Sequence, residues 1–266
     1  MSTQGPAKYV LYHYPYSICS IQVRYAFANR GEPSNQQKAV QLEERVIDIG
    51  PAREQLSEHF LCDVNSNGEV PVLVTADGSI PESVDITYKL AESYPSMIPK
   101  HCEDEVKRLL AKLHQISFFA LTFSTKKESS GSKVQGANLA LLKDKLQSVD
   151  TSERYRKAIQ HKINRIQDKK ISALTESNVS KTIQQTQDFM AEVEEKLKGS
   201  STSWILDTAE PTALDSHFIT FVARLQDVGR DDLVPDSVAR YANVAMSLPQ
   251  WKEVMQGKRT TPPMLG

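Results

Sequence analysis

The feature that most constrains the fold is a change of hydrophobic pattern across residues 94–99, which contain Pro95 and Pro99. Proline lacks an amide hydrogen and blocks a helix interior, so two prolines within six residues end any helix that reaches them. Before this segment, short apolar runs alternate with turn residues, whereas afterwards most apolar side chains recur at helical spacing. The sequence therefore predicts two domains, residues 1–95 and residues 101–266.

The first domain is predicted to be a small α+β unit. Its apolar runs are short and rich in β-formers, and the Asp77-Gly78 pair predicts a tight turn between two of them. The order strand, helix, strand, hairpin, helix is consistent with a thioredoxin-like domain. The predicted elements are strands at residues 8–12, 37–42, 71–75 and 79–81, a helix ending near Ala28, and a helix at 83–93.

The second domain is predicted to be all-helical. Its clearest patterns are the i, i+3, i+4 stripes of packed helices. Thr212 and Asp215 have the spacing of a capping box, which predicts a helix start with a structural role. The predicted segments are a helix at 102–124, a polar loop at 125–136, one or two mostly solvated helices at 143–170, and a helix at 183–197 that ends at Gly199.

Charge and composition exclude several classes of function. The net charge is −1, and the first 95 residues are acidic, so we expect no nucleic-acid partner. No apolar run has the roughly 18 residues of a spanning helix, and residues 1–8 are polar, so we expect a cytoplasmic protein without membrane contact. Cys19, Cys62 and Cys102 fit no zinc spacing, so we expect reduced thiols and no metal.

Three motifs in the first domain resemble a known family. Residues 11–24 (LYHYPYSICSIQVR) are similar to the L-Y-x-Y-x-x-S-x-C-S-x-x-V-R opening of zeta-like cytosolic glutathione transferases. Residues 65–73 (NSNGEVPVL) and 80–90 (IPESVDITYKL) resemble that superfamily's N-P-x-G-x-V-P-x-L and (E/Q)-S-x-A-I-x-x-Y-L. In the N-P-x-G-x-V-P-x-L motif, Ser66 replaces the first proline. In the (E/Q)-S-x-A-I-x-x-Y-L motif, Asp85 replaces the alanine.

The resemblance implies a glutathione-binding thioredoxin-like domain, a helical substrate-binding domain, and a homodimer. The resemblance is good over residues 8–93 and loose over residues 204–255. The segment at residues 125–180 is longer than the corresponding segment usual in the family. Zeta-like members include maleylacetoacetate isomerases, and the unusual middle segment favours a different substrate. Our interpretation is a divergent fungal member acting on a secondary metabolite.

The resemblance places a catalytic serine at Ser17. The thiol of glutathione has a pKa near ~8.5, so a protein must lower it to obtain thiolate at neutral pH. A hydroxyl donor and the N-terminus of a helix both achieve this, and Ser17 lies just before the predicted helix. Tyr14 and Tyr16 are alternative donors, and Cys19 is an alternative that would carry out thiol transfer.

Other family positions imply how glutathione is bound. The Val70–Pro71 bond is expected to be cis, with the backbone of Val70 holding the cysteinyl part, and Glu82 with Ser83 holding the γ-glutamyl end. For the glycyl carboxylate, Arg53, Gln55 and His59 are available, and no motif chooses among them.

The second substrate is expected to be a small-molecule electrophile. Phe118, Phe119 and Phe123 could line an apolar pocket for it, although an aromatic stripe at helical spacing more often belongs to the core. The predicted activity is addition of the glutathione thiolate to an unsaturated compound. The alternatives are glutathione-dependent cis-trans isomerisation and a non-catalytic binding or regulatory protein.

Overall fold

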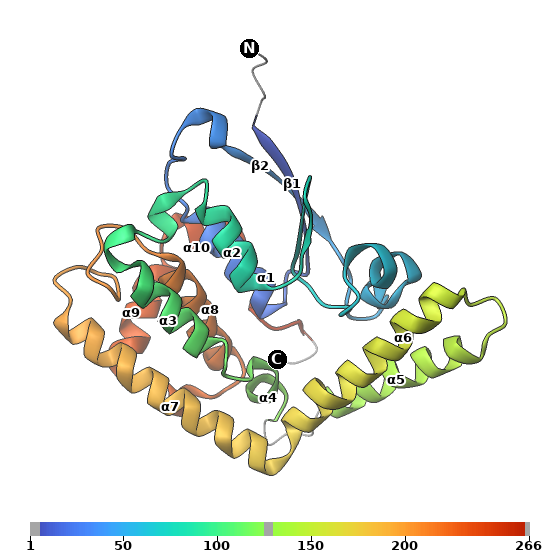
Figure 1. Ribbon diagram of the computed structural model, residues 1–266. Helices are drawn as coiled ribbons and strands as arrows, with labels where there is room; N and C mark the ends of the chain where they lie inside the picture. The colour runs from blue at the N-terminus through green and yellow to red at the C-terminus, as the bar shows by residue number, and fades with distance from the viewer. Residues whose placement is uncertain (1–5, 125–129, 264–266) are drawn as a thin grey trace.

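The computed structural model describes residues 6–124 and 130–263. As predicted, a small sheet with two helices comes first and a larger set of helices follows (Figure 1). The first part contains β1 (Ala7–His13), α1 (Ile18–Ala28), β2 (Val40–Val46), β3 (Val72–Thr75), β4 (Gly78–Ile80) and α2 (Ser83–Ala91). The second contains α3 (Glu103–Leu113), α4 (Phe118–Phe123), α5 (Ser130–Gln147), α6 (Glu153–Arg165), α7 (Glu176–Gly199), α8 (Ala213–Asp227), α9 (Asp236–Met246) and α10 (Pro249–Met255).

The sheet has the strand order β2-β1-β3-β4, with β1 parallel to β2 and the other neighbouring pairs antiparallel. Three predicted strands are confirmed, but the second lies further along the chain than residues 37–42. Residues Gln36–Lys38 instead form a 3₁₀ turn, because the side chain of Asn35 accepts a hydrogen bond from the amide of Lys38. Such a local side-chain bond competes with strand pairing.

Both faces of the sheet are covered by apolar side chains. Leu11 and Leu73 are opposite each other on β1 and β3 and belong to the main core, which includes side chains of α1, α2, α3 and α8. The next pair, Tyr12 and Val72, faces the other way and packs against Phe60 of the π-helix η3 (Phe60–Val64). This alternation follows from the two-residue period of a strand.

One helix prediction in the second part is corrected by local capping, and two others are confirmed. The single helix predicted at residues 102–124 is two helices, because Ser117 begins a new one by accepting a hydrogen bond from the amide of Ala120. At α8 the predicted capping box is present, with the Asp215 carboxylate accepting from the Thr212 amide at 2.8 Å. The helix predicted to end at Gly199 does so.

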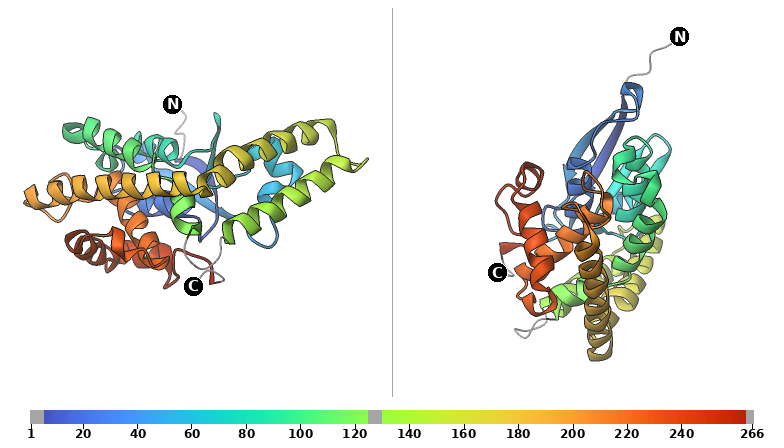
Figure 2. Two further views of the ribbon diagram at one scale, coloured as in Figure 1. Left: turned by 90° about the horizontal axis from the view of Figure 1, so that it is seen from below. Right: turned by 90° about the vertical axis from the view of Figure 1, so that its left-hand side faces the viewer.

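The largest correction concerns residues 125–170. The loop predicted at 125–136 is helix from Ser130 onward, and its residues 125–129 lie outside the described part. Helices α5 and α6 form a hairpin against residues 54–64 of the first part (Figures 1 and 2). Tyr155, Ile159 and Ile163, spaced four residues apart, bury one face of α6 against Leu56 and Leu61, so this segment is not mostly solvated.

The predicted domain boundary at residue 95 falls on the 3₁₀ turn Pro95–Met97. The division itself stays a prediction, because the main core includes side chains from both sides of this turn. Across residues 6–124 and 130–263, no helix has both the length and the apolar character that crossing a bilayer requires.

Candidate active site

Ser17 lies at the N-cap of α1, in the extended conformation that caps favour. Its Oγ accepts from the amide of Ser20 at 3.4 Å and donates to the carbonyl of Val70 at 3.4 Å. Both contacts are long, since hydroxyl donors usually lie about 2.8 Å from their acceptors. The Ser17 hydroxyl is therefore loosely held beside the positive end of an eleven-residue helix.

The Val70–Pro71 peptide bond is cis, as predicted. Val70 lies outside the strand ladder, and among the described residues its amide N–H donates to no backbone or side-chain acceptor. The loop before it is ordered by Asn65, whose side chain donates to the Glu69 carbonyl at 2.9 Å and accepts from the Asn67 amide at 3.0 Å. A peptide ligand can thus meet an unpaired backbone donor next to Ser17.

Glu82 and Ser83 mark the start of α2. Glu82 is the N-cap residue, but its side chain caps no amide, so the first-turn N–H groups lack a side-chain acceptor. Helix N-termini with free amides bind carboxylates. Glu82 is exposed as a residue, but its carboxyl is partly surrounded by protein. This partial burial, together with the nearby Glu69, raises the pKa of the carboxyl. Ser83 is buried beneath it.

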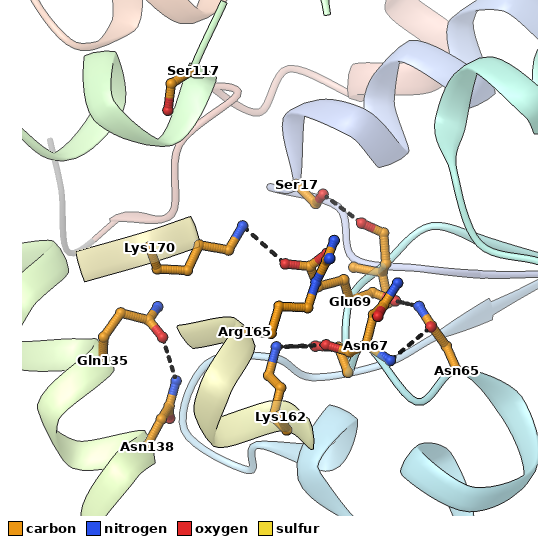
Figure 3. Close-up of polar contacts among 12 residues, drawn as sticks. Ser17, Asn65, Asn67, Glu69, Ser117, Gln135, Asn138, Lys162, Arg165 and Lys170 are labelled. Carbon is orange, nitrogen blue, oxygen red and sulfur yellow. Dashed lines mark hydrogen bonds and ion pairs between the residues drawn. The ribbon is translucent and has the colours of Figure 1, made fainter. Parts of the chain in front are cut away.

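A cation cluster around Glu69 borders the site and was not predicted (Figure 3). Arg165 of α6 donates to Glu69 Oε2 from Nε at 3.1 Å and Nη2 at 2.6 Å, and Lys170 lies 3.0 Å from Oε1. Lys162 is buried and donates to the carbonyls of Asn67 and Gly68. Burial alone raises the pKa of Glu69, but the three cations outweigh it and lower that pKa to about 2.

Sequence reasoning missed this cluster because the cations come from the segment predicted to be mostly solvated. The available signal was the spacing of Tyr155, Ile159 and Ile163, which marks a buried face and fixes where the charged residues between them point. Glu69, with which these cations pair, lies about a hundred residues earlier in the chain, so the sequence alone did not indicate the pairing.

The three alternative donors have different surroundings. Burial raises the pKa of Cys19 to about 11, which keeps its thiol protonated at neutral pH. Tyr14 packs with the apolar cluster on the sheet face opposite α1, and burial raises the pKa of its hydroxyl. The ring of Tyr16 contacts that of Tyr14, and its carbonyl accepts from Arg224 at 2.7 Å.

The three candidates for the glycyl carboxylate differ in their contacts. Gln55 is buried and donates to the Ile49 carbonyl at 3.4 Å, while His59 is exposed and lies 3.2 Å from the Asp63 carboxylate. Arg53 has a left-handed backbone (φ 51°), and within the described residues its guanidinium has no ion pair or hydrogen bond. Of the three residues, Arg53 therefore has a cation without a partner in the described part of the chain.

The three phenylalanines expected near the second substrate differ in their burial. Phe118 is buried, and its ring lies next to those of Phe221 and His114. Phe119 and Phe123 are half-buried and pack against each other at 4.7 Å between centroids. The Lys170 ammonium lies 5.2 Å from the Phe119 ring centre, which brings this aromatic pair next to the cation cluster.

A second buried polar network lies behind Ser83. Thr87 donates its only hydroxyl hydrogen to the Ser83 carbonyl at 2.8 Å, so it must accept from His217 Nε2 at 3.0 Å. His217 Nδ1 is then an acceptor, and His114 Nε2 donates to it at 2.9 Å. Burial lowers the pKa of His114 to about 4 and that of His217 further, so both rings are neutral.

No protein-family profile matches the sequence, and no curated protein is significantly similar to it. Solved structures, however, are similar to the chain over nearly its whole length. They include a glutathione transferase of Populus trichocarpa (TM-score 0.61, 16% identity, 94% of this chain and 98% of that one) and the β-etherase LigF of Sphingobium sp. strain SYK-6 (0.63, 16%, 93% and 98%). A bacterial zeta-class maleylpyruvate isomerase is also similar (0.57, 15%, 96% and 98%). The chain therefore has the glutathione transferase fold, with a thioredoxin-like first part and a helical second part.

Proposed function

We propose that this protein is a glutathione transferase that adds the glutathione thiolate to an unsaturated small-molecule electrophile. The observation that carries the proposal is the convergence of three features on one surface. They are the Ser17 hydroxyl at the start of α1, the unpaired amide of Val70 before a cis proline, and the uncapped start of α2 at Glu82 and Ser83.

These groups fit the chemistry of glutathione. The Val70 amide would donate to the cysteinyl carbonyl, and the α2 amides with the Ser83 hydroxyl would bind the γ-glutamyl carboxylate. Glu82 would accept from the γ-glutamyl ammonium, and Arg53 would pair with the glycyl carboxylate. The Val70 amide and the Arg53 guanidinium lack a hydrogen-bonding partner among the described residues, and Glu82 is exposed.

Ser17 would turn its hydroxyl from the Val70 carbonyl to the sulfur. The present bond is long and joins two neutral groups, whereas a hydrogen bond to a thiolate is charge-assisted and about twice as strong. The α1 dipole favours the same negative charge. The serine and the helix would therefore lower the pKa of the thiol and hold the nucleophile in place.

Phe119 and Phe123 are the residues that we propose for the electrophile side. If the adduct persists, the reaction is a transfer; if it rotates about the former double bond and expels the thiol, the reaction is a cis-trans isomerisation. Both begin with the same attack, so Ser17 has one role in either. A secondary metabolite substrate, a fungal source, a cytoplasmic location and a homodimer stay predictions.

The test is ultraviolet difference absorbance of the glutathione thiolate across pH, on the wild type and on Ser17→Ala. We expect a thiolate signal at neutral pH that moves to higher pH in the variant. If glutathione binds to the wild type without ionising, the catalytic proposal is wrong and the protein is a glutathione-binding module. If glutathione does not bind, the glutathione site is wrong as well.

A further inference from the structure

The three cations of the cluster around Glu69 differ in how they use their hydrogen-bond donors. Lys162 donates to the Asn67 and Gly68 carbonyls, and Arg165 donates to Glu69 through two nitrogens. Lys170 lies 3.0 Å from Glu69 Oε1 in an ion pair, and among the described residues its ammonium has no second polar partner. Lys170 therefore carries a fixed positive charge with N–H donors available to a ligand.

The fold brings this ammonium to the proposed thiol site. Lys170 lies near the end of η6 (Ile166–Ile171), a π-helix that directly continues α6. Glu69 precedes Val70, whose carbonyl accepts from Ser17, so the ion pair adjoins the Ser17 contact. The Lys170 side chain extends toward Glu69 on the side of the site where Ser17 lies (Figure 3). π-Helical turns of this kind are frequent at functional sites.

The surroundings of Lys170 leave a surplus of positive charge. Glu69 is one carboxylate shared by three cations, and Glu82 would be occupied by the γ-glutamyl ammonium. Lys170 also lies near enough to Cys19, two residues after Ser17, to favour its thiolate against burial. The ionisable groups that face one another here are Lys170, Arg165 and Lys162 from η6 and α6, Glu69, Glu82 of α2, and Cys19 of α1.

We propose that Lys170 is a second thiolate-stabilising residue, through which the helical part of the chain helps Ser17 to hold the sulfur of glutathione in its anionic form. This inference rests on the proposed function. The thiol proton leaves to water, and Lys170 contributes charge and free N–H donors to the remaining anion.

The test is the pH titration of the glutathione thiolate on Lys170→Gln, with Lys169→Gln as a matched control. Lys169 is the adjacent residue on the same turn and is exposed, so both variants remove one positive charge from the same segment. We expect Lys170→Gln to raise the thiol pKa by about one unit, which is a tenfold decrease in the ionisation constant of the thiol. Lys169→Gln should leave the titration unchanged, and Lys170→Arg should restore most of it.

Salt provides an independent readout, because Lys170 is 28% exposed and its charge is partly screened. We expect high salt to reduce the difference between wild type and Lys170→Gln, while the effect of Ser17→Ala persists. Equal titrations for Lys170→Gln and Lys169→Gln would overturn the inference and leave the proposed function intact. Absence of a thiolate signal on the wild type would instead refute the proposed function itself.

Discussion

The Ser17 hydroxyl donates to the Val70 carbonyl across 3.4 Å, joining residues 53 positions apart in the chain. This contact links the start of α1 to the loop that ends at the cis Val70–Pro71 bond. It is weak enough to be exchanged for a stronger acceptor, and the helix start beside it favours an anion.

Replacing Ser17 separates its catalytic role from its role as a helix cap. Alanine removes the hydroxyl and also costs about 1 kcal/mol of cap stability, whereas glycine removes the hydroxyl at a cost of only a few tenths of a kcal/mol. We expect Ser17→Ala and Ser17→Gly to lower kcat/KM alike, by about a hundredfold. Kinetics with a model enone and urea unfolding of both variants would measure this. Retention of activity in Ser17→Gly would contradict a role for the hydroxyl.

Cys19 is expected to be unreactive and dispensable. With its pKa raised to about 11 by burial, about one thiol in ten thousand is ionised at pH 7. Iodoacetamide should therefore label Cys19 far more slowly than free glutathione, and Cys19→Ala should keep kcat/KM within about twofold. Mass spectrometry of the labelled protein gives the rate. Rapid labelling accompanied by loss of activity would favour the thiol-transfer alternative.

Glu69 is expected to govern acid stability. Its pKa is lowered from the ordinary value of 4.5 to about 2 in the folded state, so the folded protein favours the ionised form. This stabilisation, about 3 kcal/mol, is present above pH 4.5 and is lost as the pH falls toward 2. The Glu69 contribution to the urea midpoint should therefore be nearly constant between pH 7 and 5 and fall steeply between pH 5 and 3. Glu69→Gln should be less stable at pH 7 and show a flatter pH profile, while the exposed Glu32→Gln should follow the wild type.

The buried chain of hydrogen bonds from His114 through His217 to Thr87 is expected to make the protein less stable at mildly acidic pH. Burial lowers the pKa of His114 from 6.5 to about 4, so between these values the unfolded chain binds a proton that the folded protein excludes. Stability is complete above pH 6.5 and falls by about 3 kcal/mol as the pH approaches 4. Thermal unfolding of His114→Gln, which retains a side-chain donor but cannot ionise, should depend less on pH in this range. The exposed His101→Gln should not differ from the wild type.

Much of the first part could be predicted from the sequence because its signals are local. The strand at β1, the helix start at Ser17 and the hairpin of β3 and β4 each depend on neighbouring residues. The capping box at Thr212 and Asp215 is local for the same reason. The cis bond at Val70–Pro71 is different, since it was implied by the family resemblance and not by composition or spacing.

The errors occurred where a neighbouring segment or a single side chain decided the outcome. Asn35 displaced the second strand, and Ser117 divided the helix predicted at residues 102–124. Phe118 and Phe119 have the same chemistry, and only the structure shows that Phe118 is buried against Phe221 while Phe119 is half-buried. Alternating apolar and charged residues in α6 indicated a helix without indicating what covers it.

The sequence by itself determined the order of elements, the α+β and all-helical architectures, and the positions of Ser17, Val70 and Glu82 at loop and helix ends. Only the tertiary structure decided that Lys162, Arg165 and Lys170 surround Glu69, that Arg53 differs in its contacts from His59, and that Cys19 stays protonated. The physical reason is that caps and turns are set by nearby residues, whereas burial and charge pairing depend on surfaces that meet only when the chain folds.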